Sequence, residues 1–246
     1  MLPRGVVYVA IRDKYLREAT QSARSLRRGN PRLPITLFTN KPQDVDRDLF
    51  RDVRPIEPPP KGKEMFLKQI ALQRAPYDRI LYLDADTYIC ANIGEMFGIL
   101  DSYEVAAALA PRRVDPSGFA AYGENIPEWF PEVNGGVILC RRSPGWDRLL
   151  RRWGQVYAML DKWNDQMALR VALYHEIREH RLQFYCLAPE YNCRTIMLQF
   201  IGARVRILHG RDGDMDRVCS QINSRIGARI WMPKNGLFRW RDWQHV

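Results

Sequence analysis

The sequence has few of the features that mark membrane-spanning, disulfide-linked or metal-thiolate proteins. No stretch approaches the roughly 20 consecutive apolar residues that a membrane helix needs. The five cysteines are an odd number and form no Cys-x-x-Cys pair, which argues against zinc or redox sites and favours reduced thiols. Residues 1–4 lead directly into a strand-like run and do not resemble a signal peptide. We therefore expect a cytoplasmic protein, and contact with a membrane surface stays open.

Aromatic content and charge indicate a packed globular protein with anionic partners. Hydrophobic residues make up 46% of the 246 residues, and seven tryptophans, eleven tyrosines and nine phenylalanines argue against disorder. Lysine and arginine number 38 against 28 aspartates and glutamates, so the net charge is +10. This charge favours nucleic acid, acidic lipid, nucleotide or phosphorylated partners without choosing among them.

Strand-like apolar runs alternate with helix-like segments along the chain. Residues 6–10 predict a buried strand, 14–28 a helix and 35–38 the next strand. Further strands are expected at 80–83, 105–109, 136–140, 183–187 and 205–208, and helices at 64–75, 145–160 and 165–174. This alternation predicts an α/β fold with a mostly parallel central sheet flanked by helices, where ligands bind beyond the carboxyl ends of the strands. The irregular stretch 111–131 is too long for a plain connection and is typical of a functional loop.

An acidic triplet, Asp84-Ala85-Asp86, follows the buried run 80–83. Acidic residues often finish strands and cap the next turn, so the triplet alone leaves a structural role open. Two carboxylates at this spacing also suit Mg²⁺ or Mn²⁺, which would bridge the phosphates of a nucleotide.

The segment from Leu81 to Thr87 resembles the signature of the GT-A glycosyltransferases related to glycogenin and the bacterial lipooligosaccharide galactosyltransferases. Further matches follow in the order of that family, and together they span residues 6 to 210. They are Lys68 on a predicted helix, Asn134-Gly135-Gly136-Val137, Asp165-Gln166 and His209-Gly210. The resemblance implies a GT-A fold and a sugar donor activated by a nucleoside diphosphate.

The resemblance implies a metal site made of Asp84, Asp86 and His209. A mixed set of carboxylates and imidazole suits Mn²⁺ better than Mg²⁺, although either ion remains open. The alternative for His209 is a histidine whose hydrogen bonds are satisfied at the end of a strand.

Lys68 stands on the side of its predicted helix that carries Ala71, Leu72 and Ala75, which is the side a helix usually buries. The resemblance implies that Lys68, together with Asp84 and Ala85, contacts the sugar or diphosphate of the donor. A solvated helix face is the alternative for this lysine.

Two further segments are expected beside the donor sugar. The resemblance implies that Asn134 binds sugar hydroxyls and that Gly135 and Gly136 let the backbone approach the sugar; an ordinary turn before a strand is the alternative. It also implies that Asp165 orients sugar hydroxyls while the Gln166 carbonyl stabilises positive charge on the reacting ring. Capping of the following helix by Asn164 or Asp165 is the alternative there.

The first strand and the turn after it align with the uridine-binding region of the family. Main-chain groups near Val9, Ala10 and Arg12 would read the base, and the ring of Tyr15 would stack on it. Packing of the helix is the alternative for Tyr15, so a nucleoside diphosphate is expected more firmly than UDP itself.

The sequence departs from the family after His209. Related enzymes usually have a glycine three positions later and then a Lys-Pro-Trp run, whereas Asp212 and Met215 occupy these positions here. We expect that either Arg211 or Lys234 supplies the charge that this lysine places on the diphosphate, or the C-terminal part is arranged differently from that of the family.

Two basic segments are candidates for acceptor or membrane contact. The tail 238–243 mixes cations with aromatics, which suits a membrane interface or a sugar-stacking surface, with packing onto the domain as the alternative. Arg112 and Arg113 in the long loop face either an anionic acceptor or solvent.

We therefore predict a single GT-A domain over residues 1–246, with a nucleotide-binding half (1–110) and a half for sugar and acceptor (111–246). Its expected reaction moves a sugar from a UDP-sugar to a hydroxyl of a saccharide, lipid-linked or protein acceptor, with retention of configuration by resemblance. One alternative, a nucleotidyltransferase, lacks support because no Gly-x-Gly-x-x-Gly loop follows the first strand. The other, a nucleic-acid-binding protein, is disfavoured because the arginines are scattered, so we expect no nucleic-acid partner.

Overall fold

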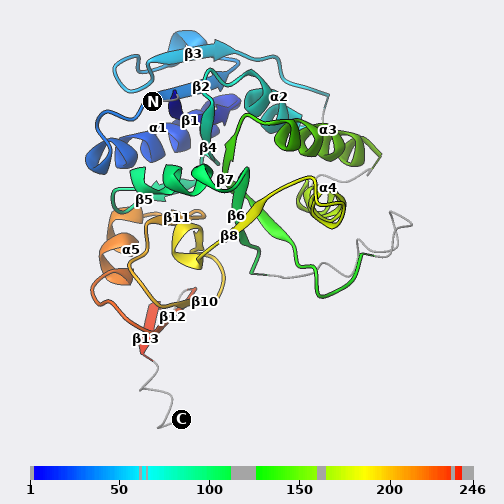
Figure 1. Cartoon of the computed structure of the whole chain (residues 1–246). Coiled ribbons are helices and arrows are strands. Elements are labelled where there is room, and N and C mark those ends of the chain that lie inside the picture. The colour runs from blue at the N-terminus through cyan, green and yellow to red at the C-terminus, as the bar shows by residue number, and fades with distance from the viewer. Residues whose placement is uncertain are drawn as a thin grey trace.

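A computed structural model describes residues 3–60, 63–64, 66–111, 126–159, 165–233 and 236–239 of the chain (Figure 1). Its centre is a seven-stranded sheet in the order β3-β2-β1-β4-β7-β6-β8. The strands are β1 (Arg4–Ala10), β2 (Ile35–Thr39), β3 (Asp52–Pro55), β4 (Arg79–Leu83), β6 (Val105–Leu109), β7 (Val133–Arg141) and β8 (Phe184–Leu187). Every neighbouring pair is parallel except the two made by β7, which runs antiparallel to both β4 and β6. The prediction of an α/β fold with a mostly parallel sheet is confirmed.

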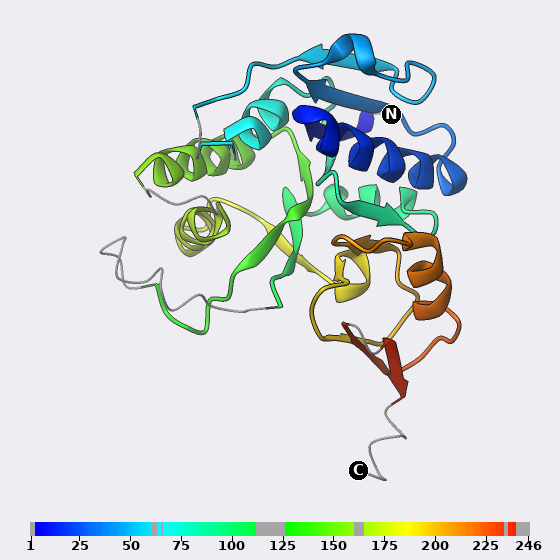
Figure 2. The ribbon, with the colours of Figure 1, turned by 180° about the vertical axis from the view of Figure 1, so that it is seen from behind.

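Helices cover both faces of this sheet, as expected. One face packs against α2 (Phe66–Arg74), α3 (Pro144–Met159) and α4 (Gln166–Arg178), and the other packs against α1 (Arg12–Gly29) and the 3-10 helix η2 (Gly94–Asp101) (Figures 1 and 2). Successive strand residues point to opposite faces. Val7 accordingly joins the first core, while Val6 and Tyr8 join the second.

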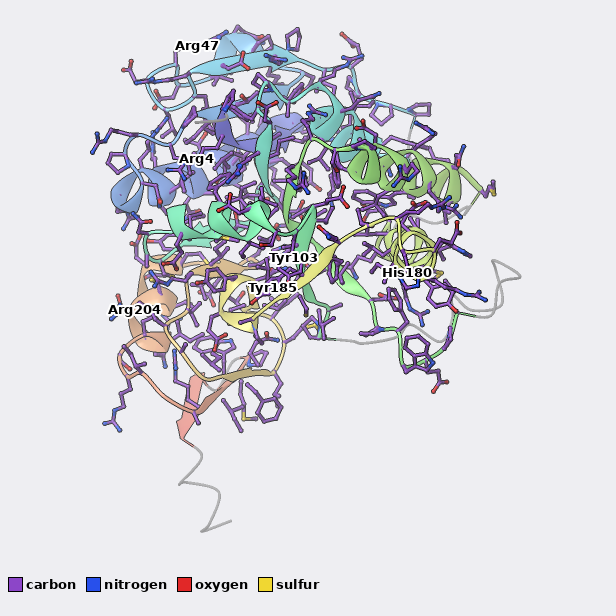
Figure 3. The ribbon with its side chains drawn as sticks, viewed as in Figure 1. Arg4, Arg47, Tyr103, His180, Tyr185 and Arg204 are labelled. Carbon is purple, nitrogen blue, oxygen red and sulfur yellow. The ribbon has the colours of Figure 1, made fainter. Side chains whose placement is uncertain are left out.

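The sheet ends at β8, whose residues are partly exposed. The rings of Tyr103 and Tyr185 contact each other at this edge, with their centroids 5.1 Å apart (Figure 3).

The C-terminal part adds two small sheets and a helix below the central sheet (Figure 1). The first sheet has the order β5-β11-β9 and the second β10-β12-β13. Their bounds are β5 (Thr87–Ile89), β9 (Cys193–Arg194), β10 (Gln199–Ile201), β11 (Ile207–His209), β12 (Arg229–Met232), β13 (Gly236–Arg239) and α5 (Met215–Ile222). Because β5 starts right after the acidic triplet, its pairing with β11 brings a distant part of the chain to that triplet.

Most predicted elements are found within one or two residues of the expected bounds. One alternative was wrong: Asn134, Gly135 and Gly136 lie inside β7 and do not form a turn before it. Neither glycine has the positive φ that such a turn would need, and the space around Gly136 gives a different reason for its presence. Among the described residues, no helix combines the length and apolar character needed to span a membrane.

Several sequence predictions concern residues outside the described part of the chain. These are the loop residues Arg112 and Arg113, the cap candidate Asn164, Lys234, and the tail from residue 240 onward.

Candidate active site

A cavity of about 560 Å³ opens where β1 and β4 end and β7 begins, a size typical of small-molecule sites. Because β7 is antiparallel, its first residues meet the last residues of β4, and the Asp84 amide donates to the Gly136 carbonyl over 2.8 Å. All the predicted site residues except Ala10 line this cavity; Ala10 itself is buried in the sheet. The lining residues from the prediction are Val9, Arg12, Tyr15, Lys68, Asp84, Ala85, Asp86, Asn134, Gly135, Gly136, Asp165, Gln166 and His209.

Asp84, Asp86 and His209 form a cluster whose candidate ligand atoms all lie within 4.8 Å of one another. His209 is the last residue of β11 and pairs with Thr87, while the Gly210 amide donates to the Asp86 carbonyl over 3.0 Å. Nε2 of His209 lies 3.4 Å from Asp86 Oδ1 and 3.7 Å from Asp84 Oδ2. Two carboxylates and one imidazole in this arrangement are a donor set that a divalent cation such as Mn²⁺ fits.

A chain of amide hydrogen bonds determines which nitrogen of His209 faces the carboxylates. The backbone N–H of Gly136 donates to Asn134 Oδ1 over 3.0 Å, and this identifies the acceptor atom of Asn134 because a backbone N–H can only donate. The same oxygen accepts from Nδ2 of Asn192 over 2.9 Å. Oδ1 of Asn192 is therefore the atom that lies 2.8 Å from Nδ1 of His209.

It follows that Nδ1 of His209 donates to Asn192, so the nitrogen whose lone pair is available to bind a metal is Nε2. This is the form in which histidine binds metals, with its other nitrogen held by a hydrogen bond. Asn192 was missed in the sequence because it lies in a short irregular segment before β9, where no periodic pattern marks it.

Gly136 provides the space that this cluster needs. A Cβ atom at Gly136 would lie 2.0 Å from Cε1 of His209 and 2.7 Å from Oδ2 of Asp84. Real carbon contacts begin at about 3.5 Å, so no other residue fits here without moving the imidazole.

Lys68 is buried at the floor of the cavity between two carboxylates. Its Nζ lies 3.4 Å from Asp165 Oδ2 and 3.7 Å from Asp84 Oδ1, and it donates to the Gly135 carbonyl over 3.0 Å. Burial alone would lower the pKa of Lys68, but Asp165 and Asp84 outweigh it and raise the pKa above its ordinary value. The expectation of a buried helix face is confirmed, since Ala71 and Leu72 are also fully buried.

Asp165 immediately precedes α4, yet its side chain does not cap that helix. Oδ2 of Asp165 is buried and, within the described part of the chain, makes only the ion pair with Lys68. Burial raises the pKa of Asp165, and Lys68 only partly counteracts this effect. Gln166 beside it accepts a 2.8 Å hydrogen bond from Asn134 Nδ2.

Tyr82 is a cavity residue that the sequence prediction treated only as part of a strand. Its hydroxyl donates to Asp84 Oδ1 over 2.9 Å, and burial raises the pKa of Tyr82 well above the ordinary value. The signal was available, because residues two apart in a strand point to the same face and Tyr82 precedes Asp84 by two.

Two arginines stand at the cluster. Arg211 Nη1 lies 3.3 Å from Asp86 Oδ2, and its Nε and Nη2 donate to the two carboxylate oxygens of Glu18 over 2.7 and 3.0 Å. Arg194, which the sequence prediction did not name, places Nη1 3.0 Å from Nε2 of His209. Burial would raise the pKa of Asp86, but His209 and the two arginines hold it well below its ordinary value.

The predicted nucleotide-binding turn lies at the rim of the cavity. Arg12 has a φ of 73°, a left-handed conformation that is uncommon outside glycine and tends to occur at functional sites. The Arg12 amide donates to Asn40 Oδ1 over 3.2 Å. The ring of Tyr15 packs against the core on one side, and its centroid lies 5.9 Å from the Arg211 guanidinium.

Comparison with known proteins gives matches in structure only. No protein-family model and no curated protein sequence matches the chain. Mouse xyloside xylosyltransferase 1 in its apo form matches with a TM-score of 0.56 and 17% identity, over 85% of this chain and 97% of that chain. The glycosyltransferase GlyE of Streptococcus pneumoniae TIGR4 matches with a TM-score of 0.54 and 19% identity, over 86% of this chain and 56% of GlyE. Its apo form gives a TM-score of 0.56 and 18% identity, over 86% of this chain and 55% of GlyE.

These matches show that the chain has the fold of GT-A glycosyltransferases, and the resemblance seen in the sequence is confirmed at that level. The chain spans just over half the length of GlyE but nearly all of the mouse enzyme. The cluster of Asp84, Asp86 and His209 could hold a metal ion in this cavity.

Proposed function

We propose that this protein is a metal-dependent glycosyltransferase that transfers a sugar from a UDP-sugar to an acceptor hydroxyl. The observation that carries the proposal is the cluster of Asp84, Asp86 and His209, in which Nε2 of the histidine faces both carboxylates inside the cavity of a GT-A fold. The order of the sequence motifs, from Lys68 to His209, supports it independently.

The side chains of Asp84, Asp86 and His209 would hold Mn²⁺, or Mg²⁺ in its place. Bound there, the cation would neutralise negative charge on the departing diphosphate. Lys68 places its positive charge 3.7 Å from Oδ1 of Asp84. The Tyr82 hydroxyl donates to this same oxygen, and Oδ2 of Asp84 is the oxygen that lies near His209.

We assign the donor's parts to the two ends of the cavity. The uracil would lie against Val9, Arg12 and Tyr15 at the rim, where the ring of Tyr15 is partly exposed. The sugar would lie at Asp165, whose buried Oδ2 has no hydrogen-bond donor among the described residues. Residues 1–110 would thus bind the nucleotide, and later residues the sugar and acceptor.

The reaction we propose retains the configuration of the anomeric carbon. The acceptor oxygen forms a bond to that carbon as the bond to the diphosphate oxygen breaks, and the hydroxyl proton passes to a diphosphate oxygen on the same face. No protein carboxylate is needed as a base in this scheme. The Gln166 amide, oriented by Asn134, directs its carbonyl dipole towards the positive charge that develops on the sugar ring.

The acceptor is proposed only as a class: a hydroxyl of a saccharide, of a lipid-linked saccharide or of a protein. The net charge of +10 favours an anionic acceptor and is compatible with a location at an acidic membrane surface.

A panel of UDP- and GDP-sugars with Mn²⁺ tests the proposal. UDP-xylose belongs in the panel because the mouse protein with the matching fold is a xylosyltransferase. We expect one UDP-sugar to raise the melting temperature and to be hydrolysed slowly, and Asp86→Ala to abolish both effects. Asp101→Ala, which removes an exposed carboxylate paired with Arg79, is the matched control and should behave as the parent does. If no donor gives a metal-dependent response, the proposal is wrong.

A further inference from the structure

Arg194 is the cavity cation that lacks an acidic partner. Three other cations that line the cavity have carboxylates within 4.0 Å: Lys68 has Asp84 and Asp165, Arg211 has Glu18 and Asp86, and Arg12 has Glu64. Arg194 forms no such ion pair with any residue that the structure describes.

The guanidinium of Arg194 has one buried donor, Nε, that is left without an acceptor within the described ranges. Its Nη1 lies against the imidazole of His209, 3.0 Å from Nε2 and 3.3 Å from Nδ1. A buried cation that has no acidic partner and one unpaired donor is costly, and proteins normally pair such a group. The missing partner is therefore expected to be an anion that enters the cavity.

The backbone holds Arg194 next to the metal cluster. β9 and β11 are parallel neighbours, and Arg194 pairs with His209 in their register. The Thr195 amide donates to the His209 carbonyl over 3.0 Å, which fixes the end of β9 against the end of β11. An anion bound at Asp84, Asp86 and His209 through a divalent cation would thus be adjacent to the Arg194 guanidinium.

Arg211 and Lys234, the cations expected from the sequence to bind the diphosphate, are weaker candidates than Arg194. Arg211 already donates twice to Glu18 and pairs with Asp86, so most of its donors are occupied. Lys234 lies outside the described residues. Arg194 comes from a segment before His209, whereas the family motif places the corresponding lysine after it.

We propose that Arg194 binds the diphosphate of the nucleotide-sugar donor. This assignment rests on the proposed function and names the residue that takes over the charge of the missing lysine. The planar guanidinium presents paired N–H groups that match phosphate oxygens in a two-point contact. In the absence of the diphosphate, the same positive charge opposes a divalent cation at the neighbouring cluster, so metal and nucleotide assist each other's binding.

Calorimetric titrations of UDP and of uridine in saturating Mn²⁺, together with titrations of Mn²⁺ alone, test this role. Arg194→Gln should weaken UDP binding by about 10- to 100-fold, the range for a lost hydrogen bond to a charged group, and leave uridine binding unchanged. It should bind Mn²⁺ alone as well as the parent or more tightly. Arg194→Lys keeps the charge but loses the paired N–H groups, so it should bind UDP more tightly than Arg194→Gln and less tightly than the parent. Arg206→Gln is the matched control, because Arg206 bonds the Asn92 carbonyl and does not line the cavity.

Three results would overturn the assignment. An Arg194→Gln variant that binds UDP as the parent does removes the diphosphate role. Equal losses for UDP and uridine, or a weaker affinity for Mn²⁺ alone, would show that Arg194 only supports the structure around His209. In all three cases the proposed function stands if the parent binds UDP with Mn²⁺. If the parent binds neither UDP nor Mn²⁺, the proposed function is wrong, and this assignment is wrong with it.

Discussion

Replacing Gly136 by alanine adds one methyl group directly in front of the metal cluster. The new Cβ would lie 2.0 Å from Cε1 of His209, whereas carbon atoms in contact stay at least about 3.5 Å apart. The imidazole must therefore retreat by roughly 1.5 Å, since β7 is held between β4 and β6 and cannot shift easily. Metal–ligand distances are defined to about 0.2 Å, so the displaced histidine leaves the coordination sphere.

We expect Gly136→Ala to weaken Mn²⁺ binding by at least about 10- to 100-fold, the loss seen when groups that only support the ligands are changed. Electron paramagnetic resonance of free Mn²⁺ during a titration measures this directly. Gly98→Ala is the matched control, because Gly98 is exposed and a Cβ there meets nothing within 4 Å. Parent-like Mn²⁺ affinity in Gly136→Ala, with the fold intact by circular dichroism, would refute the placement of His209 at the metal.

Three further substitutions test other parts of the account. Asn192→Leu removes the acceptor for Nδ1 of His209 and should weaken Mn²⁺ binding about 10- to 100-fold. Asn192→Asp keeps an acceptor and should lose less. If both variants bind Mn²⁺ as the parent does in the same titration, Asn192 does not orient the histidine for the metal. Lys68→Met leaves two carboxylates without their buried cation and should lower the free energy of unfolding by about 3–5 kcal/mol in urea titrations, and a parent-like midpoint would contradict this. Glu176→Gln removes a buried charge that pairs with three arginines across α3 and α4. It should cost about 2 kcal/mol of stability, less than a fully buried pair because the arginines are a third exposed, without changing Mn²⁺ affinity.

Much of the fold could be predicted because the central strands are nearly continuous apolar runs. β1, β4 and β6 are buried on both faces, so their sequences contain little else than apolar residues between turn signals. The location of the cavity followed from the same pattern, since ligands of such sheets bind beyond the carboxyl strand ends.

Most of the C-terminal sheets lack a comparable signal in the sequence. The run 205–208 did predict β11, but β9 and β10 are two or three residues long, too short for a periodic pattern, and they form only because distant segments pair. The antiparallel direction of β7 was equally hidden, because strand direction depends on how the chain returns to the sheet. Asn192 and Arg194 were missed for this reason: their importance comes from the pairing of β9 with β11.

The roles of the site residues stay predictions, although the structure brings them together. His209 lies more than a hundred residues after Asp84 and Asp86 in the sequence and meets them through the pairing of β5 with β11. Motif order alone pointed to this set, and the hydrogen-bond chain through Asn134 and Asn192 adds a physical reason for the histidine.

The most direct test of the central claim is the thermodynamic coupling between Mn²⁺ and UDP. If the cluster holds a cation that contacts the diphosphate, saturating Mn²⁺ should tighten UDP binding by a factor within about 5- to 150-fold, and UDP should tighten Mn²⁺ binding by the same factor. Asp86→Asn should remove this coupling while the affinity of uridine is kept. A UDP affinity in the parent that is identical in EDTA and in saturating Mn²⁺ would contradict the account.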